Sequence, residues 1–254
     1  MSSPKSETPK LNKGQQTKAL ILETALELFR ERGYEQTTMR DIAEKANVAL
    51  GNTYYYFRSK EHLIQAFYHR TQEELLAASE PILAKERSLK ARLLGIMKAR
   101  LELIEPYHQF AGVLFRTAGD PKSPLNPFSV ESLETRKQST ATFEQVVEGA
   151  RLRVAIPADL YAELPNLLWI YQMGIILFWI HDTSTNRIRT HQLIEHTVDI
   201  VAKLVTIATF PLVRPLIKRT LHLLAAFRQD LDNLPAPNPD EEIDKDELDN
   251  ELEP

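Results

Sequence analysis

Apolar residues recur at helical spacing along most of the chain, and no segment shows the strict alternation of a half-buried strand. Residues 15–32 show the pattern clearly, because Ile21, Ala25 and Leu28 share one face of a helix. Gly33 follows the last turn, where a residue with positive φ commonly ends a helix. The pattern therefore predicts an amphipathic helix that ends just before Gly33.

Two short helices are predicted next. Thr38 and Asp41 have the spacing of a capping box, so a helix should begin there and end near Lys45. Asn47 lies where the chain must turn, and asparagine tolerates positive φ better than other residues with a side chain. A second short helix is expected over residues 49–57.

Longer helices make up the rest of the chain. Ser59 should cap a helix that extends toward Ser79 and is stopped by Pro81. Further helices are predicted over 88–104, 107–117, 129–153, 159–181, 190–209 and 212–231, with loops at 119–127 and 182–186. The predicted fold class is all-α, with an N-terminal three-helix domain and a larger C-terminal helical domain.

Residues 38–57 have the organisation of a helix-turn-helix, in which the second helix enters the DNA major groove. That second helix ends in the run Tyr54, Tyr55 and Tyr56. Successive helical residues point about 100° apart, so the three rings cannot share one environment. A phenol beside DNA packs its ring on sugar and donates its hydroxyl to a phosphate. Phe57 has no hydroxyl and is predicted to lie in the core.

The stretch TKALILETALELFRERGYEQTTMRDIAEKANVALGNTYYYFRSKEHLIQAFY resembles the DNA-binding domain of the TetR (tetracycline-repressor) family, over about a quarter of the chain. The resemblance implies phosphate contacts by Thr38, Tyr54, Tyr56 and Lys60. It implies base contacts by Arg40, Leu50, Gly51 and Asn52. Tyr55 matches a family aromatic that partly packs and partly touches the DNA backbone.

Ala49 departs from the family pattern, which often has Ser or Thr at the start of the recognition helix. Losing that N-cap costs about 1 kcal/mol and removes a polar contact. Hydrogen-bonded readout would then depend mainly on Arg40, which suits guanine, and Asn52, which suits adenine. Leu50 is suited to a thymine methyl, and DNA shape is expected to supply much of the remaining discrimination.

The C-terminal part is less specific in sequence. The resemblance implies a helical domain that forms a homodimer and encloses a small, mainly apolar effector. Residues 164–182 are apolar nearly all round and residues 196–210 are apolar with a polar seam, so two such helices per subunit would form a four-helix interface. The candidate effector-binding residues are Tyr107, His108, Phe110, Phe115, Trp169 and Gln172. Aromatic residues on helices, however, pack in a core far more often than they contact a ligand.

Composition divides the chain into regions of opposite charge. Residues 229–254 carry eleven acids and one base, and removing their charge of −10 from the total of −4 leaves +6 on residues 1–228. We expect a flexible arm at 1–14, a DNA-binding domain at 15–68, a ligand-binding and dimerisation domain at 69–234, and a disordered acidic tail at 235–254. The tail is a solubilising end or, alternatively, a competitor for the basic arm that weakens non-specific DNA binding.

Several classes of protein are not supported. The chain has no cysteine, and its longest apolar run, residues 167–180, is shorter than the roughly 20 residues of a membrane span. We therefore expect a cytoplasmic protein with no membrane partner. His191 and His196 do not form a metal-site pattern, and no cofactor is expected. No nucleophile–base pair or phosphate-binding glycine loop indicates an enzyme.

The prediction is a ligand-responsive, homodimeric DNA-binding repressor that recognises a palindromic, double-stranded operator. The alternative is a helical adaptor that binds protein through its C-terminal apolar faces. Residues 210–231 predict an extra amphipathic helix with a basic face. Docking of this helix on the core is favoured over an extended dimer interface or a membrane surface.

Overall fold

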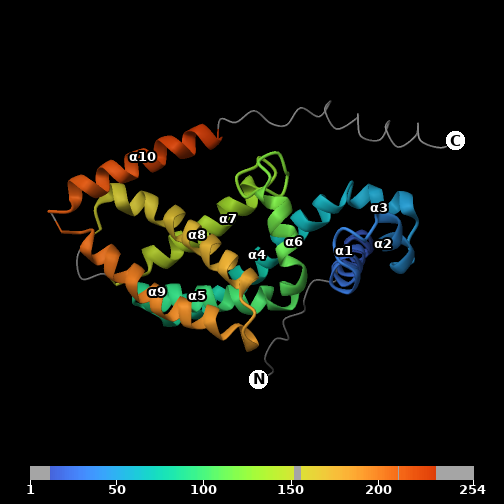
Figure 1. The fold of residues 1–254 in the computed structure, drawn as a ribbon, viewed down its shortest axis with the longest axis horizontal. Coiled ribbons are helices and arrows are strands. Elements are labelled where there is room, and N and C mark those ends of the chain that lie inside the picture. The colour runs from blue at the N-terminus through green and yellow to red at the C-terminus, as the bar shows by residue number, and fades with distance from the viewer. Residues whose placement is uncertain (1–11, 152–155, 211, 233–254) are drawn as a thin grey trace, which may run out of the picture.

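The computed structural model describes residues 12–151, 156–210 and 212–232. Within these ranges the secondary structure is helical and includes no strand, which confirms the all-α prediction. A small group of helices, α1 to α3, lies at one end of an elongated molecule, and α4 leads from it into a larger bundle (Figure 1). The helices are α1 Lys13–Arg32, α2 Met39–Lys45, α3 Leu50–Tyr56, α4 Lys60–Lys85, α5 Leu89–Ile104, α6 His108–Gly119, α7 Leu133–Glu148, α8 Ala158–His181, α9 Ile188–Ile207 and α10 Arg214–Asp232, with 3₁₀ turns η1 Glu105–Tyr107 and η2 Thr185–Arg187.

Helix α1 starts and ends on local signals. Asn12 and Gln15 form a reciprocal capping box, so the helix begins two residues before the predicted position. Gly33 has φ 89°, as predicted, and its backbone N–H donates to the carbonyl of Phe29. Both ends of α1 are therefore set by residues within it or beside it.

The prediction that Pro81 stops α4 is wrong. The helix continues past Pro81 because tertiary contacts stabilise its last turn. Arg92 of α5 donates to the carbonyl of Leu83 at 2.7 Å, which satisfies a helix-terminal acceptor. Ile82 packs so closely on Gly95 of α5 that a Cβ there would lie 2.5 Å from its Cγ2 atom. Packing against α5 outweighs the hydrogen bond that proline cannot make.

Helix α7 is shorter than the predicted span of 129–153. Residues before it form consecutive turns, in which the Asn126 side chain accepts from the backbone of Phe128 and Ser129 accepts from the backbone of Ser132. These side-chain bonds to the backbone compete with helix formation, so the helix begins only at Leu133. Residues 152–155, at the predicted end, lie outside the described ranges.

Two hydrophobic cores share helix α4. The larger core joins α4, α5, α7, α8 and α9 through Leu75, Leu93, Ile96, Met97, Phe143, Val146, Leu168, Trp179, Ile194 and Val198. The smaller core joins the N-terminal helices to α4 and α6 through Ile21, Leu26, Phe29, Ile42, Phe57, Leu63, Phe67, Phe110 and Leu114. Because α4 is continuous between the two cores, movement of one part can be transmitted to the other through a rigid element.

Helix α10 docks on α8, as the sequence favoured. Leu221 is buried with Leu160 of α8 and Ala208, and Ile217 packs against the same cluster. The basic residues Arg214, Lys218 and Arg219 remain exposed. The helix therefore packs through Ile217 and Leu221, while Leu216, Leu223 and the basic face remain in solvent.

Asp182 ties the end of α8 to the beginning of α9. It is almost fully buried and its carboxylate accepts from the backbone N–H and hydroxyl of both Ser184 and Thr190, at 2.6–2.9 Å. Burial alone raises the pKa of Asp182, but the hydrogen bonds from Ser184 and Thr190 outweigh it and the net pKa is lowered.

We expect Asp182→Asn to reduce the free energy of unfolding by roughly 1.5–3 kcal/mol at neutral pH, because an amide group then faces donors that need acceptors. Since the folded-state pKa is depressed, this stability is present above the ordinary aspartate pKa and is lost as the pH falls toward the folded value. Urea unfolding at several pH values should show that the difference in the free energy of unfolding between the variant and the wild type becomes smaller in acid. Glu144→Gln, on exposed surface, is the control and should change little. A difference in the free energy of unfolding that does not change with pH would contradict this role of the Asp182 carboxylate.

Candidate DNA interface and effector site

Helices α2 and α3 are joined by the predicted turn. Asn47 has φ 53°, and the N–H of Val48 after it donates to the carbonyl of Ala43 at 3.0 Å. Lys45, at the end of α2, pairs with Glu27 and Glu31 of α1 at 3.2 and 2.8 Å. The orientation of α3 is thus fixed by the turn and by the attachment of α2 to α1.

The capping residue Thr38 is exposed but fully hydrogen-bonded. Its hydroxyl and its backbone N–H both donate to the Asp41 carboxylate, at 2.7 and 2.8 Å, and its oxygen accepts from the Asp41 N–H. The predicted capping box is confirmed. A phosphate at Thr38 would have to displace one of these bonds, so the contact stays a prediction with an identified competitor.

The predicted base-reading residues are accessible to solvent. Arg40, Gly51 and Asn52 are exposed, and Leu50 is half-buried. A Cβ added at Gly51 would meet no atom within 4 Å, so the position is open to an approaching duplex. Ala49 makes no side-chain cap, as predicted from its methyl group.

The three tyrosines occupy different environments. Tyr54 and Tyr55 are 46% and 80% exposed, whereas Tyr56 is half-buried against the smaller core. The Tyr55 ring makes an edge contact with that of Tyr56, and the partial packing and DNA contact expected of Tyr55 stay predictions. Phe57 is buried, as predicted.

Lys60 lies at the first position of α4 and is half-exposed. Its ammonium donates to the carbonyl of Tyr34 at 2.9 Å and sits 4.5 Å from the centre of that ring. The Tyr34 hydroxyl donates to Glu61. Burial is the main cause of the raised pKa of the Tyr34 hydroxyl, and this hydrogen bond raises the pKa further. The lysine is held in place by Tyr34 while retaining further N–H donors for a phosphate.

Three of the predicted effector residues lie away from the larger core. Phe110 is buried in the smaller core between Phe29 and Phe67. Tyr107 accepts from Arg70 of α4 at 3.1 Å and packs on Phe67. Phe115 is 41% exposed. Amphipathic spacing along α6 did not reveal that its inner face packs on the DNA-binding helices.

The other three predicted effector residues lie among α8 and its neighbours. Trp169 and Gln172 are buried, and the Gln172 carbonyl oxygen has no hydrogen-bond partner. His108 bonds to the carbonyl of Trp179 and to Arg187, both at 2.9 Å, so it connects the start of α6 to the end of α8 and to η2. The six residues therefore do not surround one common space, and contact of each with an effector stays a prediction.

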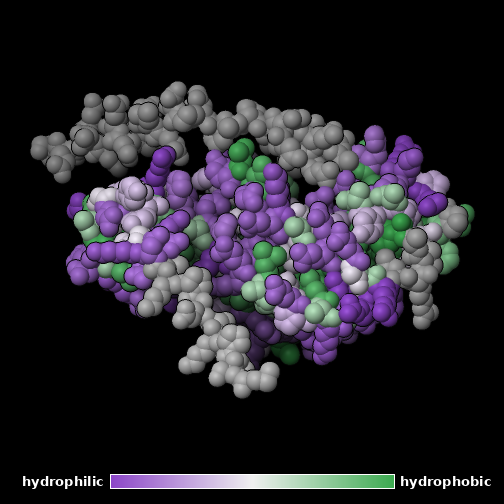
Figure 2. Space-filling model, turned by 180° about the vertical axis from the view of Figure 1, so that it is seen from behind, coloured by the Kyte–Doolittle hydropathy of each residue, from purple (hydrophilic) through white to green (hydrophobic). Residues whose placement is uncertain are grey.

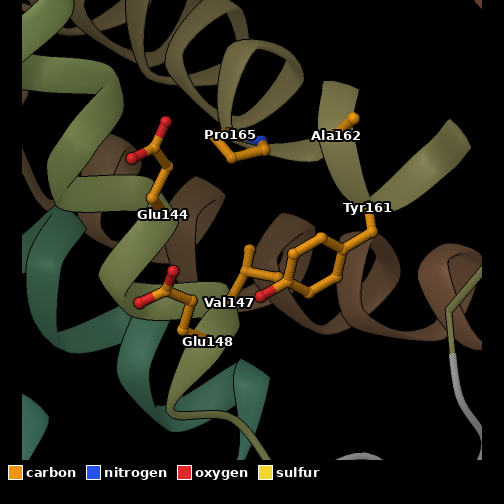
Figure 3. Close-up of a pocket in the computed structure, with 6 residues that line it drawn as sticks. All are labelled: Glu144, Val147, Glu148, Tyr161, Ala162 and Pro165. Atoms are coloured by element: carbon orange, nitrogen blue, oxygen red, sulfur yellow. The ribbon is translucent and has the colours of Figure 1, made fainter. Parts of the chain in front are cut away.

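The described part of the chain includes two small cavities. One, of about 130 Å³, lies between α7 and α8, with the carboxylates of Glu144 and Glu148 opposite the Tyr161 ring (Figure 3). The other, of about 240 Å³, lies near Glu105 and His191. Both are below the roughly 300–1,000 Å³ of typical ligand pockets, and none of the six predicted residues lines them.

Sequence reasoning missed several residues that position the interface. Tyr34 orients Lys60, and Gly14 lies beside the Tyr56 hydroxyl, where an added Cβ would approach to 3.3 Å. The capping-box spacing of Asn12 and Gln15 could have revealed the early start of α1. No comparable local signal marks Tyr34, whose role depends on contacts with residues far along the chain.

A helix-turn-helix with exposed polar and phenolic side chains, continuous through α4 with an all-helical domain, defines a DNA-binding regulator of transcription. Residues 21–67 match the model of bacterial regulatory proteins of the tetR family, and residues 92–222, just over half of the chain, match the tetracyclin repressor-like C-terminal domain. The chain belongs to the TetR family. It is a non-enzymatic, DNA-binding regulator, and the adaptor alternative is not favoured.

Relatives and solved structures agree with this assignment. The transcriptional repressor KstR2 of Mycolicibacterium smegmatis is 27% identical over 154 residues, which are 59% of this chain and 75% of that protein. The transcriptional regulator TtgR of Pseudomonas putida is 44% identical over 69 residues, 26% of this chain and 33% of its own.

Two solved structures share the fold at 16% identity. A TetR-family regulator from Syntrophomonas wolfei has a TM-score of 0.59 and covers 75% of this chain and 96% of its own. The regulator FadR of Bacillus subtilis, in complex with stearoyl-CoA, has a TM-score of 0.55 and covers 71% and 96%.

Proposed function

We propose that the protein is a homodimeric repressor that binds a palindromic operator and releases it when a small, mainly apolar effector binds the C-terminal domain. The observation that carries the dimer is an uncovered apolar surface on α8 and α9. Its members are Ile170, Leu177 and Phe178 of α8 and Ile200, Leu204 and Ile207 of α9, each 38–56% exposed. We call these residues the α8–α9 face.

The α8–α9 face has the spacing of a helix-packing surface. Ile200, Leu204 and Ile207 recur every three or four residues along α9, and on α8 Leu177 lies two helical turns after Ile170, with Phe178 beside it. Gly174 lies within the α8 stripe, and no atom lies within 4 Å of a Cβ built there, so a second helix has room to approach closely. Figure 2 shows exposed apolar residues among the polar ones on one side of the molecule.

Helix α8 is long and apolar enough to cross a membrane, by length and composition only, and it is the single such helix in the described ranges. Only 39% of its most apolar window is buried within one chain. A second subunit packed on the α8–α9 face would cover this surface, as expected for an obligate interface. Because the second subunit would cover the apolar side of α8, the cytoplasm, where the operator lies, is favoured over a membrane location.

Two-fold symmetry supports a palindromic operator. A dimer presents two copies of α3, which can enter successive major grooves on one side of the DNA, about one helical turn apart. Because α4 links the helix-turn-helix to the larger core, an effector that moves α4 would change the separation of the two α3 helices. The stearoyl-CoA complex of FadR supports an effector with a large apolar part.

Two substitutions test the DNA-binding surface. Arg40→Ala should cost roughly 1–3 kcal/mol of operator binding and relax specificity at one base, whereas Lys60→Ala should weaken binding to all sequences similarly. Electrophoretic shifts with DNA from upstream of the protein's own operon, and with single-base variants of it, measure both effects. Arg219→Ala, on exposed α10 away from α3, is the control (Figure 1).

Equal effects of Arg40→Ala and Lys60→Ala on specificity would contradict the division of roles. Binding of the wild type that is sensitive to salt but indifferent to sequence would contradict the proposed function itself.

A further inference from the structure

Arg100 of α5 is a buried arginine with few partners. It is 7% exposed, and the larger core surrounds it on α5 through Met97 and Leu101. One terminal nitrogen donates to the side-chain carbonyl of Gln72, and the other lies 3.5 Å from the carbonyl of Thr71. The Nε–H is buried and has no partner. A guanidinium has five N–H donors, so most of its capacity is unused here.

Arg92, two turns earlier on α5, shows what a structural arginine looks like in the same helix. It is 4% exposed and donates to four backbone carbonyls at 2.6–3.0 Å. The acceptors belong to Leu83, Glu86, Gln145 and Val146, at the C-terminal ends of α4 and α7. Helix C-termini carry partial negative charge, so the Arg92 cation is compensated there. Arg100 faces no such terminus.

Among the described residues, no carboxylate lies within ion-pairing distance of Arg100. Burial lowers the pKa of Arg100 to about 10, and no neighbouring charge contributes to that shift. The side chain is still a cation at neutral pH. Buried charges in proteins are normally paired or bind a ligand, because an uncompensated one is costly.

Polar groups from two further helices lie beside the guanidinium. The amide nitrogen of Gln72 donates to the hydroxyl of Thr142 at 3.1 Å and to the carbonyl of Gln138 at 3.3 Å. These contacts place Arg100 where α4, α5 and α7 pack together, three helices of the larger bundle (Figure 1). Its neighbours along α5, Met97 and Leu101, belong to the larger hydrophobic core.

We propose that Arg100 binds the carboxylate of the effector, which is an apolar monocarboxylic acid. The inference rests on the proposed ligand-responsive function and names the chemical class of the ligand. A carboxylate matches the fork of unused guanidinium donors and supplies the single negative charge that the site lacks. A more highly charged group would bring excess charge into the core. The apolar body of the acid suits the hydrophobic residues around Arg100.

Binding at Arg100 also provides a route to the DNA. A carboxylate competes with Gln72 for the guanidinium, and Gln72 belongs to α4, the helix that begins at Lys60. Arg100 lines neither of the two cavities described above, and an acid that parts α4 from α5 would reach the guanidinium. Entry of the acid would then displace α4 relative to the core.

The first test needs no ligand. Since Arg100 is uncompensated in the free protein, Arg100→Met should leave the thermal unfolding midpoint unchanged or raise it, because methionine fills a similar volume without a buried charge. Arg92→Met is the matched comparison and should lower the midpoint by several degrees, because it leaves four carbonyls unsatisfied. An Arg100→Met midpoint as low as that of Arg92→Met would show a structural arginine and overturn the proposal.

The second test measures binding by calorimetry with octanoic, palmitic and phenylbutyric acids and their methyl esters. At least one acid should bind the wild type about 30-fold or more tightly than its ester, and Arg100→Met should bind acid and ester alike. Acids that bind the wild type no more tightly than their esters, or a preference for acids that persists in Arg100→Met, would overturn the proposal.

Operator binding by wild type and Arg100→Met is measured separately. A wild type that binds the operator but shows no preference for acids over esters rejects the ligand assignment alone, whereas absent operator binding by the wild type rejects the proposed function.

Discussion

A variant with Ile200→Glu and Leu204→Glu is expected to be monomeric and to lose operator affinity by roughly 10²–10⁴-fold. Both residues lie on the α8–α9 face and are 53% and 56% exposed in one chain, so the substitution places carboxylates where two subunits would meet. Two linked binding modules gain about this factor over one, so a monomer should bind a single half-site only weakly. Sedimentation velocity and titration with full and half operators measure the two effects.

Thr206→Glu is the matched control, because Thr206 is exposed on α9 but lies away from the stripe of apolar residues. It adds one carboxylate to the same helix, where the double variant adds two, and it should leave both the oligomeric state and operator affinity unchanged. Circular dichroism of both variants should match the wild type. A double variant that stays dimeric and binds the full operator normally would place the interface elsewhere.

Phe110→Ala should reduce the free energy of unfolding by about 3–5 kcal/mol, the typical cost of deleting a buried phenylalanine ring. Phe110 is 2% exposed and its ring lies 6.1 Å from that of Phe29 in α1 and 6.4 Å from that of Phe67 in α4. The cavity would open between α6 and the DNA-binding helices. Urea unfolding measures the loss, and operator titration should show weaker binding because the attachment of α1 to α6 is loosened.

Phe115→Ala tests the same chemistry on the other side of α6. Phe115 is 41% exposed, so its removal should change the free energy of unfolding by much less than that of Phe110. Similar losses for the two variants would mean that Phe110 does not join the two parts of the molecule in the way the smaller core indicates.

The elements of the fold were largely predictable because their signals are local. The capping box joins Thr38 and Asp41, which are three positions apart in the chain. The positive φ values of Asn47 and Gly33 are each the conformation of a single residue. Helical periodicity predicted the long helices for the same reason. Local rules failed at Pro81, where contacts from α5 stabilise a helix that the sequence alone would end.

The DNA-binding surface was predicted better than the effector site. Exposure of Arg40, Asn52 and Tyr54 follows from helical geometry once the two short helices are located. The predicted effector residues instead divide between two cores and the surface, because an aromatic side chain on a helix packs equally well on any neighbouring helix. Arg100 was not predicted, since an arginine in an amphipathic helix is normally in solvent.

By itself, the sequence determined the helices, the helix-turn-helix and the family resemblance, because capping, turn chemistry and periodicity act between residues close along the chain. Only the tertiary structure decided which helix faces meet, and with them the place of α6 against the DNA-binding helices, the support of Lys60 by Tyr34 and the burial of Arg100 without a counter-charge. These features depend on pairs of residues tens of positions apart. Their energies arise from desolvation and packing that exist only after the helices have assembled.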